Sequence, residues 1–310
     1  MYCHHFGFER VPFSITPDTS FVYSSTSQRN ALNVLLMATD AGEGFIKITG
    51  EVGSGKTLLC RRFLARLAAA NESRRRFRTA YVPNPCLRPL TLLMTIAAEF
   101  KLRVPDPDSE SSLLNSINRA LLRYAARGEQ VVVCLDEAQS MPVETIESLR
   151  LLSNMETEQR KLIQVVLVGQ RELDAKLAHD NLRQLRSRIS FSYRLGSLSL
   201  AETGAYLEHR AKVAGYCKST PLFTERAIRG IHSAARGLPR RINILAHKAL
   251  LAAYGQGADR VDVSHVKAAR ADAVTPGIRA MLHDWLTRIL SALHLRRINL
   301  PVRANQGISP

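Results

Sequence analysis

Residues 50–57 of this sequence read GEVGSGKT, and the fold is decided there. The apolar stretch 45–49 precedes them, and residues 58–70 have the composition of a helix. The segment fits the pattern G-x-x-x-x-G-K-[ST], whose glycines let backbone N–H groups curl around an anion. The following helix aims its own N-terminal N–H groups at that anion. We therefore expect a strand, a phosphate loop and a helix that bind a nucleoside triphosphate.

Individual roles follow from the chemistry of a bound triphosphate. Lys56 is expected to reach the β- and γ-phosphates, and the Thr57 hydroxyl is expected to hold Mg²⁺. The surrounding residues are expected to complete the phosphate cradle: Gly50, Glu51, Val52, Gly53, Ser54, Gly55 and Leu58. No guanine-reading N-K-x-D motif occurs in the chain.

A second strand is predicted over residues 131–135, and two acids follow it directly. Five apolar residues in a row are typical of a strand that is buried on both faces of a parallel sheet. Open α/β sheets bind ligands at the carboxyl ends of their strands. Asp136 is therefore expected in the Mg²⁺ shell, at a strand tip adjoining that of Lys56, and Glu137 is expected to polarise the attacking water.

A third strand is predicted over residues 162–168, beside the strand that ends at Asp136. Gln170 follows its tip, where a polar side chain can orient water or contact the γ-phosphate; the alternative is a polar helix cap. A fourth, weaker strand covers residues 79–82.

Two groups of arginines are candidates for phosphate contacts. Arg183, Arg186 and Arg188 lie at the end of a short helix, before an expected strand over residues 189–193. Arginine there can reach the γ-phosphate of a neighbouring subunit and stabilise the transition state. Arg188 is the preferred candidate and Arg186 the second; the alternative is a solvated basic face.

The second group lies in the stretch 237–243, GLPRRIN. A turn opens a helix there, and Arg240 falls in its first turn, where a cation is unfavourable for the helix dipole. A bound anion would compensate for that placement. We therefore expect Arg240 to act as a second phosphate sensor, reaching from a lid.

These features together resemble an AAA+ ATPase. The beginning of the chain narrows the resemblance, with FGF at 6–8, PF at 12–13 and TPD at 16–18. This start, with the stretches LDEAQ, LVGQREL and LRSRI, resembles the ExeA/GspA-type secretion ATPases, including the MshM proteins of MSHA pilus biogenesis. The resemblance runs from residue 1 to about 270. It implies ATP and Mg²⁺ as ligands and an N-terminal segment that packs by the adenine. Family roles are implied for Lys56, Thr57, Asp136, Glu137, Gln170, Arg188 and Arg240.

The expected fold class is α/β: a P-loop NTPase (AAA+) αβα sandwich with a parallel sheet, a small all-helical lid and an amphipathic tail. The nucleotide-binding domain is expected over 1–200, the lid over 201–272 and the tail over 273–310. Long ExeA-type proteins continue into a membrane span and a peptidoglycan-binding domain, so the short form is expected here. Residues 278–297 have one apolar face and several arginines, a pattern that fits an anionic membrane surface, a partner or the lid itself.

The chain has 310 residues, with 43 Lys and Arg against 27 Asp and Glu, a formal net charge of +16. This charge favours an anionic partner without choosing among nucleic acid, membrane and acidic protein. Five scattered cysteines form no C-x-x-C pair and indicate reduced thiols. With no signal peptide and no apolar run long enough to span a bilayer, a cytoplasmic location is expected, with peripheral contact to the inner membrane as a further possibility.

The expected function is an oligomeric ATPase that energises assembly of an envelope machine: a secretion system, an MSHA-type pilus or exopolysaccharide export. A homo-oligomer and an inner-membrane component are the expected partners. The alternative is a DNA-associated AAA+ regulator of the TniB/TnsC transposition type, which the positive charge also fits. A signalling switch is weaker, because no sensor repeats follow the lid.

Overall fold

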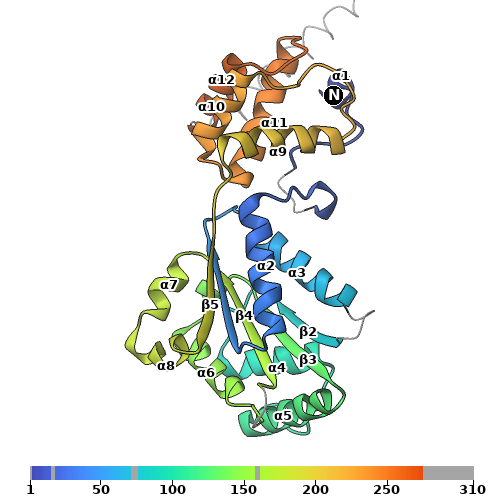
Figure 1. Ribbon diagram of the computed structural model, residues 1–310. Helices are drawn as coiled ribbons and strands as arrows, with labels where there is room; N and C mark the ends of the chain where they lie inside the picture. The colour runs from blue at the N-terminus through green and yellow to red at the C-terminus, as the bar shows by residue number, and fades with distance from the viewer. Residues whose placement is uncertain (1, 15–17, 71–75, 158–160, 275–310) are drawn as a thin grey trace, which may run out of the picture.

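The structure is a computed structural model that describes residues 2–14, 18–70, 76–157 and 161–274 (Figure 1). It contains one five-stranded sheet, in which every pair of neighbouring strands is parallel and the order is β2-β3-β4-β1-β5. The strands are β1 (Phe45–Gly50), β2 (Arg76–Val82), β3 (Glu129–Leu135), β4 (Ile163–Gly169) and β5 (Ile189–Leu195). The predicted tail segment 278–297 lies outside the described residues.

Burial of the strands explains this order. Every residue of the central strand β4 is buried, whereas exposed and buried residues mix along the edge strand β2. Parallel strands require crossover connections, which place helices on both faces of the sheet. The apolar runs from which β3 and β4 were predicted therefore form the strands that helices bury on both faces of the sheet.

Two separate apolar cores fill the two faces of the sheet. One lies under α2 (Thr26–Asp40) and α3 (Lys56–Ala70). The other lies under α4 (Pro89–Glu99), α5 (Glu110–Ala126) and α6 (Val143–Ser153). Two short helical turns, η2 (Ala138–Ser140) and η3 (Asp180–Leu182), and the short helices α7 (Glu172–Leu177) and α8 (Arg183–Arg186) complete this part, whereas the turn η1 (Thr19–Phe21) buries Phe21 in a third core, that of the C-terminal helices. The predicted αβα sandwich is thereby confirmed.

The predicted helical lid is also confirmed. It consists of α9 (Leu200–Val213), α10 (Glu225–Ala235), α11 (Pro239–Gly255) and α12 (Val263–Val274). Local signals set the helix starts: Ser199 and Glu202 form a capping box on α9, and Pro239 occupies the first position of α11. Glu202 also accepts a hydrogen bond from the Thr26 backbone N–H (2.9 Å), so one carboxylate joins the starts of α9 and α2.

The N-terminal segment packs on the lid, at the opposite end of the molecule from α5 (Figure 1). Helix α1 (Tyr2–Phe6) and the residues that follow it bury Phe6, Phe8 and Phe13 in the same core as α9, α10 and α11. These aromatic residues precede the sandwich in sequence but contribute their apolar surface to the lid. Within the described ranges, none of the helices combines the length and hydropathy needed to cross a bilayer.

We predict that Phe6→Ala destabilises the lid by about 3–5 kcal/mol, because the side chain is fully buried and leaves a cavity. Amide hydrogen exchange followed by mass spectrometry should rise in α9 and α11 more than in α3. The matched control is Val11→Ala, since Val11 is 44% exposed in the same segment. Equal exchange in the Phe6 variant and the unaltered chain would contradict the packing described here.

Candidate nucleotide-binding site

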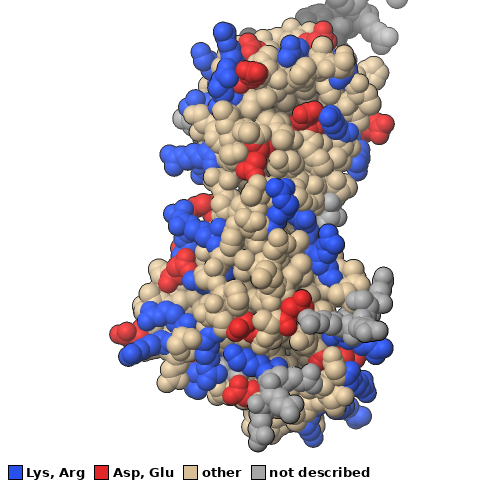
Figure 2. Space-filling model, in the orientation of Figure 1, with Lys and Arg blue, Asp and Glu red and all other residues tan. Residues whose placement is uncertain are grey.

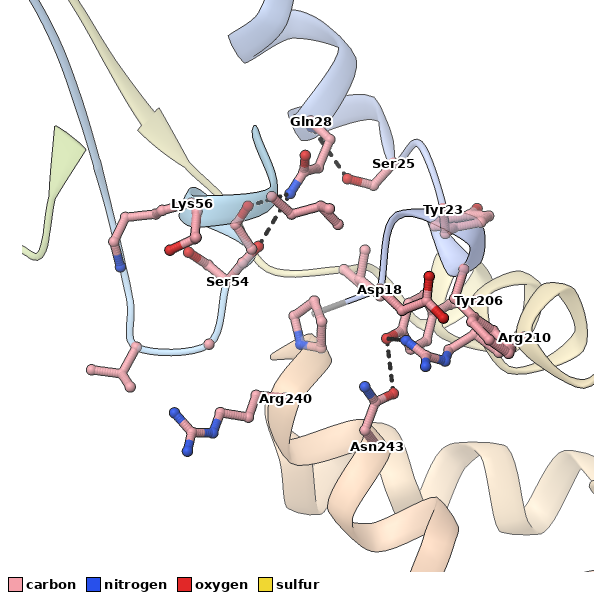
Figure 3. Close-up of a pocket in the computed structure, with 18 of the residues that line it drawn as sticks. Asp18, Tyr23, Ser25, Gln28, Ser54, Lys56, Tyr206, Arg210, Arg240 and Asn243 are labelled. Atoms are coloured by element: carbon pink, nitrogen blue, oxygen red, sulfur yellow. Dashed lines mark hydrogen bonds between the residues drawn. The ribbon is translucent and has the colours of Figure 1, made fainter. Parts of the chain in front are cut away.

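A cavity of about 380 Å³ opens between the sandwich and the lid. Figure 3 shows how its walls come from distant parts of the chain: the phosphate loop, the start of α2, the segment around Asp18, and the lid helices α9 and α11. Seven of the nine residues predicted for the phosphate cradle and the magnesium hydroxyl line it: Val52, Gly53, Ser54, Gly55, Lys56, Thr57 and Leu58. Gly50 and Glu51 lie behind the loop and point their backbone carbonyls at Lys56.

Two loop glycines have a positive φ, and one of them is also required by space. Gly53 has φ +79°, and a Cβ there would lie 2.5 Å from Cβ of Arg240. Gly55 has φ +95°, and a Cβ there would lie 2.6 Å from Nε2 of Gln28. The loop is therefore held against the lid at a distance that only a glycine at position 53 permits, while Gly55 is favoured by its backbone conformation.

Lys56 is nearly fully buried and points its charge into the loop. Its Nζ donates to the carbonyls of Gly50 and Glu51, at 3.0 Å each. Burial lowers the pKa of Lys56, while the carboxylates of Glu137 and Asp136 act in the opposite direction. A buried ammonium group that is satisfied only by neutral carbonyls is favourably placed to receive an anion.

Asp136 lies at the tip of β3 and is 1% exposed. It accepts hydrogen bonds from the hydroxyls of Thr57 and Tyr81, the latter at 3.2 Å. Burial raises the pKa of Asp136, and the bonds from Thr57, the Glu137 N–H and Tyr81 oppose that rise. Hydroxyl and carboxylate oxygens side by side suit Mg²⁺, which takes few protein ligands and completes its shell with phosphates and water.

One expectation about this region was wrong in detail. The strands that lead to Lys56 and Asp136 are not adjoining, because β4 lies between β1 and β3. The two sites still meet, since α3 carries Thr57 across the end of β4 to Asp136. This arrangement places Gln170, which follows β4, between the phosphate loop and the acidic pair.

Glu137 is held in place by two glutamine side chains. Nε2 of Gln139 and Nε2 of Gln170 both donate to Glu137 Oε2, at 2.6 Å and 3.1 Å. The Oε1 of Gln139 accepts from the backbone N–H of Gln170 at 2.9 Å, which closes the network. Glu137 itself has φ +57°, a left-handed conformation that is uncommon for a residue with a side chain and is found at functional sites.

This network sets the charge of Glu137. Burial alone would raise the pKa of Glu137, but the hydrogen bonds from Gln139 and Gln170 and the charge of Lys56 outweigh it. The pKa of Glu137 is therefore lowered, and the side chain is a carboxylate at neutral pH. Both Glu137 and Gln170 line the cavity.

Arg240 lies at the cavity, on the first turn of α11, as the sequence predicted. Its backbone N–H donates to the carbonyl of Gly53 at 3.2 Å, so the lid touches the phosphate loop directly. In Figure 3 its side chain extends away from Asn243 along the loop side of the cavity.

Arg188 and Arg186 are not among the described residues that line this cavity. Arg188 directly precedes β5, whose first residue pairs with Phe45, while Leu195 at the other end pairs with Gly50. Five residues of parallel strand, about 17 Å, separate the two ends. Arg186 is exposed, and its guanidinium contacts the carbonyl of Ala178. Neither arginine is positioned to reach a phosphate in its own chain.

Several side chains at the site were not assigned roles from the sequence. Gln28, at the start of α2, donates to the loop carbonyls of Ser54 and Gly55. These residues are far apart in the sequence, so no local pattern indicates the contact. Tyr81 lies in the weakest predicted strand, 79–82. Gln139 belongs to the stretch LDEAQ, so a signal was present, but its contact with Gln170 depends on the pairing of β3 with β4.

The lid side of the cavity is built around one network. Tyr206 donates to Asn243 Oδ1 (2.8 Å), and Arg210 donates both to Tyr206 and to the carbonyl of Pro12. Asn243 also donates to the carbonyl of Ser14. The N-terminal segment is thereby fastened to the lid beside the cavity, where Ser14, Asp18 and Phe21 form part of the wall.

Residues 39–177 match a protein family described as an AAA domain. Over 261 residues the chain is 39% identical to the general secretion pathway protein A of Aeromonas hydrophila. The match covers 84% of this chain and 46% of that relative, so the chain spans less than half of the relative's length.

Solved structures support the same fold. The ORC2 protein of Aeropyrum pernix, in its ADPNP-ADP complexes, is similar with a TM-score of 0.61 and 20% identity, over 85% of this chain and 71% of that one. The RuvB Holliday junction branch migration motor of Thermotoga maritima has a TM-score of 0.51 and 18% identity, over 84% and 72%. With the phosphate loop, the acidic pair and the lid in place, this chain belongs to the AAA+ family of P-loop ATPases and, within it, to the ExeA/GspA group.

Proposed function

We propose that the chain binds ATP with Mg²⁺ in the cavity between sandwich and lid, and that Glu137 activates the water that attacks the γ-phosphate. The observation that carries this proposal is the state of Glu137: a carboxylate at the cavity wall, beside the phosphate loop, oriented by two amide donors. A glutamate with a purely structural role at this turn would not require two amide donors to its carboxylate.

The other residues divide the work between them. Lys56 binds the β- and γ-phosphates from the loop, exchanging its carbonyl partners for anionic oxygens. Thr57 and Asp136 hold the metal, which supplies positive charge against the phosphates when it is bound. Gln170 lies between the loop and Glu137 and orients water toward the terminal phosphate.

Gln139 is a positioning residue in this scheme. It touches Glu137 through its amide nitrogen and Gln170 through its amide oxygen, so it fixes both side chains at once. Lys176 donates to the backbone carbonyl of Gln139 at 2.6 Å and ties this segment to α7. We infer that Gln139 keeps the carboxylate deprotonated and aimed at the cavity.

We propose that the functional unit is a homo-oligomer in which Arg188 serves the site of a neighbouring subunit. The placement of Arg188 at the far end of β5 from its own phosphate loop supports a role in trans. Arg240 then senses the bound phosphates within the subunit, because its backbone already contacts Gly53.

The machine that this ATPase serves is proposed from its relative alone. General secretion pathway protein A carries secretion in its name, and the similarity extends over most of this chain. We propose that the chain energises the assembly of an envelope machine, through an inner-membrane component, from the cytoplasmic side. MSHA-type pilus biogenesis and exopolysaccharide export are narrower forms of this proposal, and contact of 278–297 with anionic lipid is a further part of it.

Glu137→Gln is expected to bind ATP as tightly as the unaltered chain but to hydrolyse it about 10²–10⁴-fold more slowly, since the general base is lost. Binding is measured with a fluorescent ATP analogue and turnover by phosphate release. Lys56→Ala provides the contrast, because removing a charge-assisted phosphate contact should weaken nucleotide binding itself. Near-normal turnover in the Glu137 variant would show that another group activates the water.

Gln139→Ala is expected to raise the pKa of Glu137, because a donor to the carboxylate is removed. The acid limb of the kcat–pH profile should therefore move to higher pH, and Gln139→Glu should move it further by adding a second negative charge. Plateau kcat should fall roughly tenfold to a hundredfold from the loss of orientation. Gln184→Ala, an exposed glutamine elsewhere, is the control; an unmoved acid limb in both Gln139 variants would refute the positioning role.

The trans role of Arg188 is tested by mixing two inactive variants. Arg188→Ala subunits keep Glu137, and Glu137→Gln subunits keep Arg188, so mixed oligomers regain complete sites. With equal amounts and random assembly, about a quarter of interfaces should be complete, and phosphate release should recover accordingly. The same mixture with Arg186→Ala distinguishes the two arginines. Absence of recovery at every ratio, with oligomers present by light scattering, would exclude Arg188 from the neighbouring site.

A further inference from the structure

A basic groove of about 840 Å³ lies at the end of the sandwich that faces away from the lid. It runs between α5 and the loop that follows α4. Figure 2 shows several blue side chains, with red ones among them, around this lower end of the molecule. The cations that line the groove are Arg78, Lys101, Arg103, Arg119, Arg123 and Arg127.

The groove holds almost no compensating negative charge. Glu129 is buried and accepts a hydrogen bond from Nε of Arg78, at 2.7 Å. The hydrogen bond from Arg78 is the largest cause that lowers the pKa of Glu129, and the charges of Arg78, Arg127 and Arg76 act in the same direction. Among the described residues, none of the other five cations forms an ion pair with an acid. A concave surface with this excess charge focuses an electrostatic potential that attracts anions.

The backbone of Lys101 gives a second observation about the groove. It follows the C-cap of α4 and has φ +54°, in the left-handed region where the residue after a helix C-cap is usually glycine. Its N–H and that of Leu102 bond back to the carbonyls of Ala98 and Ala97, which fixes this conformation. A lysine at a position that favours glycine places its charge at the groove at the expense of local stability.

The spacing of the arginines indicates the shape of the ligand. Arg119, Arg123 and Arg127 follow one another at four-residue intervals along α5 and beyond its end, about 6 Å apart along the axis. In an extended peptide, alternate side chains on one face lie about 6.7 Å apart. Acidic side chains at every second position of an extended segment therefore match this row, and arginine forks suit carboxylates.

Two other anionic partners fit less well. A membrane surface is flat, whereas these cations surround a hollow. Single-stranded nucleic acid needs open aromatic faces for stacking. Here the guanidinium carbon of Arg78 lies over the ring of Tyr124, 5.3 Å from its centroid, and the same ring packs on Phe100. Leu122, 45% exposed, adds an apolar contact that suits a peptide side chain between acids.

We propose that this groove binds an extended acidic segment of a partner protein, with carboxylates at alternate positions on the arginine row. This inference does not depend on the proposed ATPase mechanism, because the groove lies at the opposite end of the sandwich from the cavity. A motor subunit with such a groove holds a partner without blocking nucleotide exchange.

The test uses the full chain and a short fluorescein-labelled peptide with Glu at every second position and Leu or Ala between. Fluorescence anisotropy should show saturable binding that weakens as salt screens the charges. The triple variant Arg119→Gln, Arg123→Gln, Arg127→Gln should lose affinity about tenfold or more, because three charge-assisted contacts disappear. The matched control removes the same charge from the lid, through Arg226→Gln, Arg229→Gln and Arg270→Gln, and should leave affinity unchanged.

Lys101→Gly separates binding from stability. Glycine relieves the left-handed backbone and removes the charge, so peptide affinity should fall while Tm stays level or rises. ATP turnover should be unchanged in every groove variant, which separates failure of this inference from failure of the proposed hydrolysis.

Three outcomes would overturn the inference: no binding of the peptide, equal loss in the lid control, or unchanged affinity in both groove variants. Tighter, groove-dependent binding of a thymidine oligonucleotide or of phosphatidylserine vesicles would show that the groove serves a different class of partner. A peptide of the same composition with its Glu residues grouped at one end should bind less tightly; equal binding would refute the alternating arrangement.

Discussion

The site depends on the contact between the phosphate loop and the lid. The Arg240 N–H donates to the Gly53 carbonyl, and only a glycine at position 53 leaves room for the Arg240 side chain. The cradle that binds phosphates is therefore shaped by a helix that begins almost 190 residues later in the chain. A change in the loop on nucleotide binding reaches α11 through one backbone hydrogen bond and one steric contact, with no intervening element.

Electrostatics at the cavity shows why this contact matters. Lys56, Asp136 and Glu137 are gathered in one buried region, and each is compensated differently: by carbonyls, by hydroxyls and by amides. Burial opposes the charged form of all three, and the hydrogen bonds favour the ionised form of both acids. An anion and its metal satisfy the lysine and the acids together, so ligand binding removes the cost of keeping these charges out of water.

Much of this architecture could be predicted from sequence because its signals are local. The phosphate loop is contiguous, and the apolar runs of β3 and β4 require burial on both faces. The lid helices α9 and α10 begin at capping residues, and α11 begins at a proline. What the sequence did not reveal depends on pairing between distant segments. The insertion of β4 between β1 and β3 places Gln139 against Gln170, and the packing of Phe6 and Phe13 on the lid needs the whole fold. The basic groove likewise combines residues from β2, from α5 and from the segment after α4, so no single stretch of the sequence indicates it.

The end of the sandwich at the cavity and the end at the basic groove share the same pair of strands. At their starts, Arg78 of β2 bonds Glu129 of β3 in the basic groove; at their ends, Tyr81 of β2 bonds Asp136, which follows β3. Close-packed strands transmit position better than they change shape. We infer that a partner held in the groove does not sense the nucleotide through a deformed groove. Nucleotide binding can affect such a partner only by changing how the sandwich and the lid sit against each other, since the lid contacts the loop through α11 and completes the cavity wall.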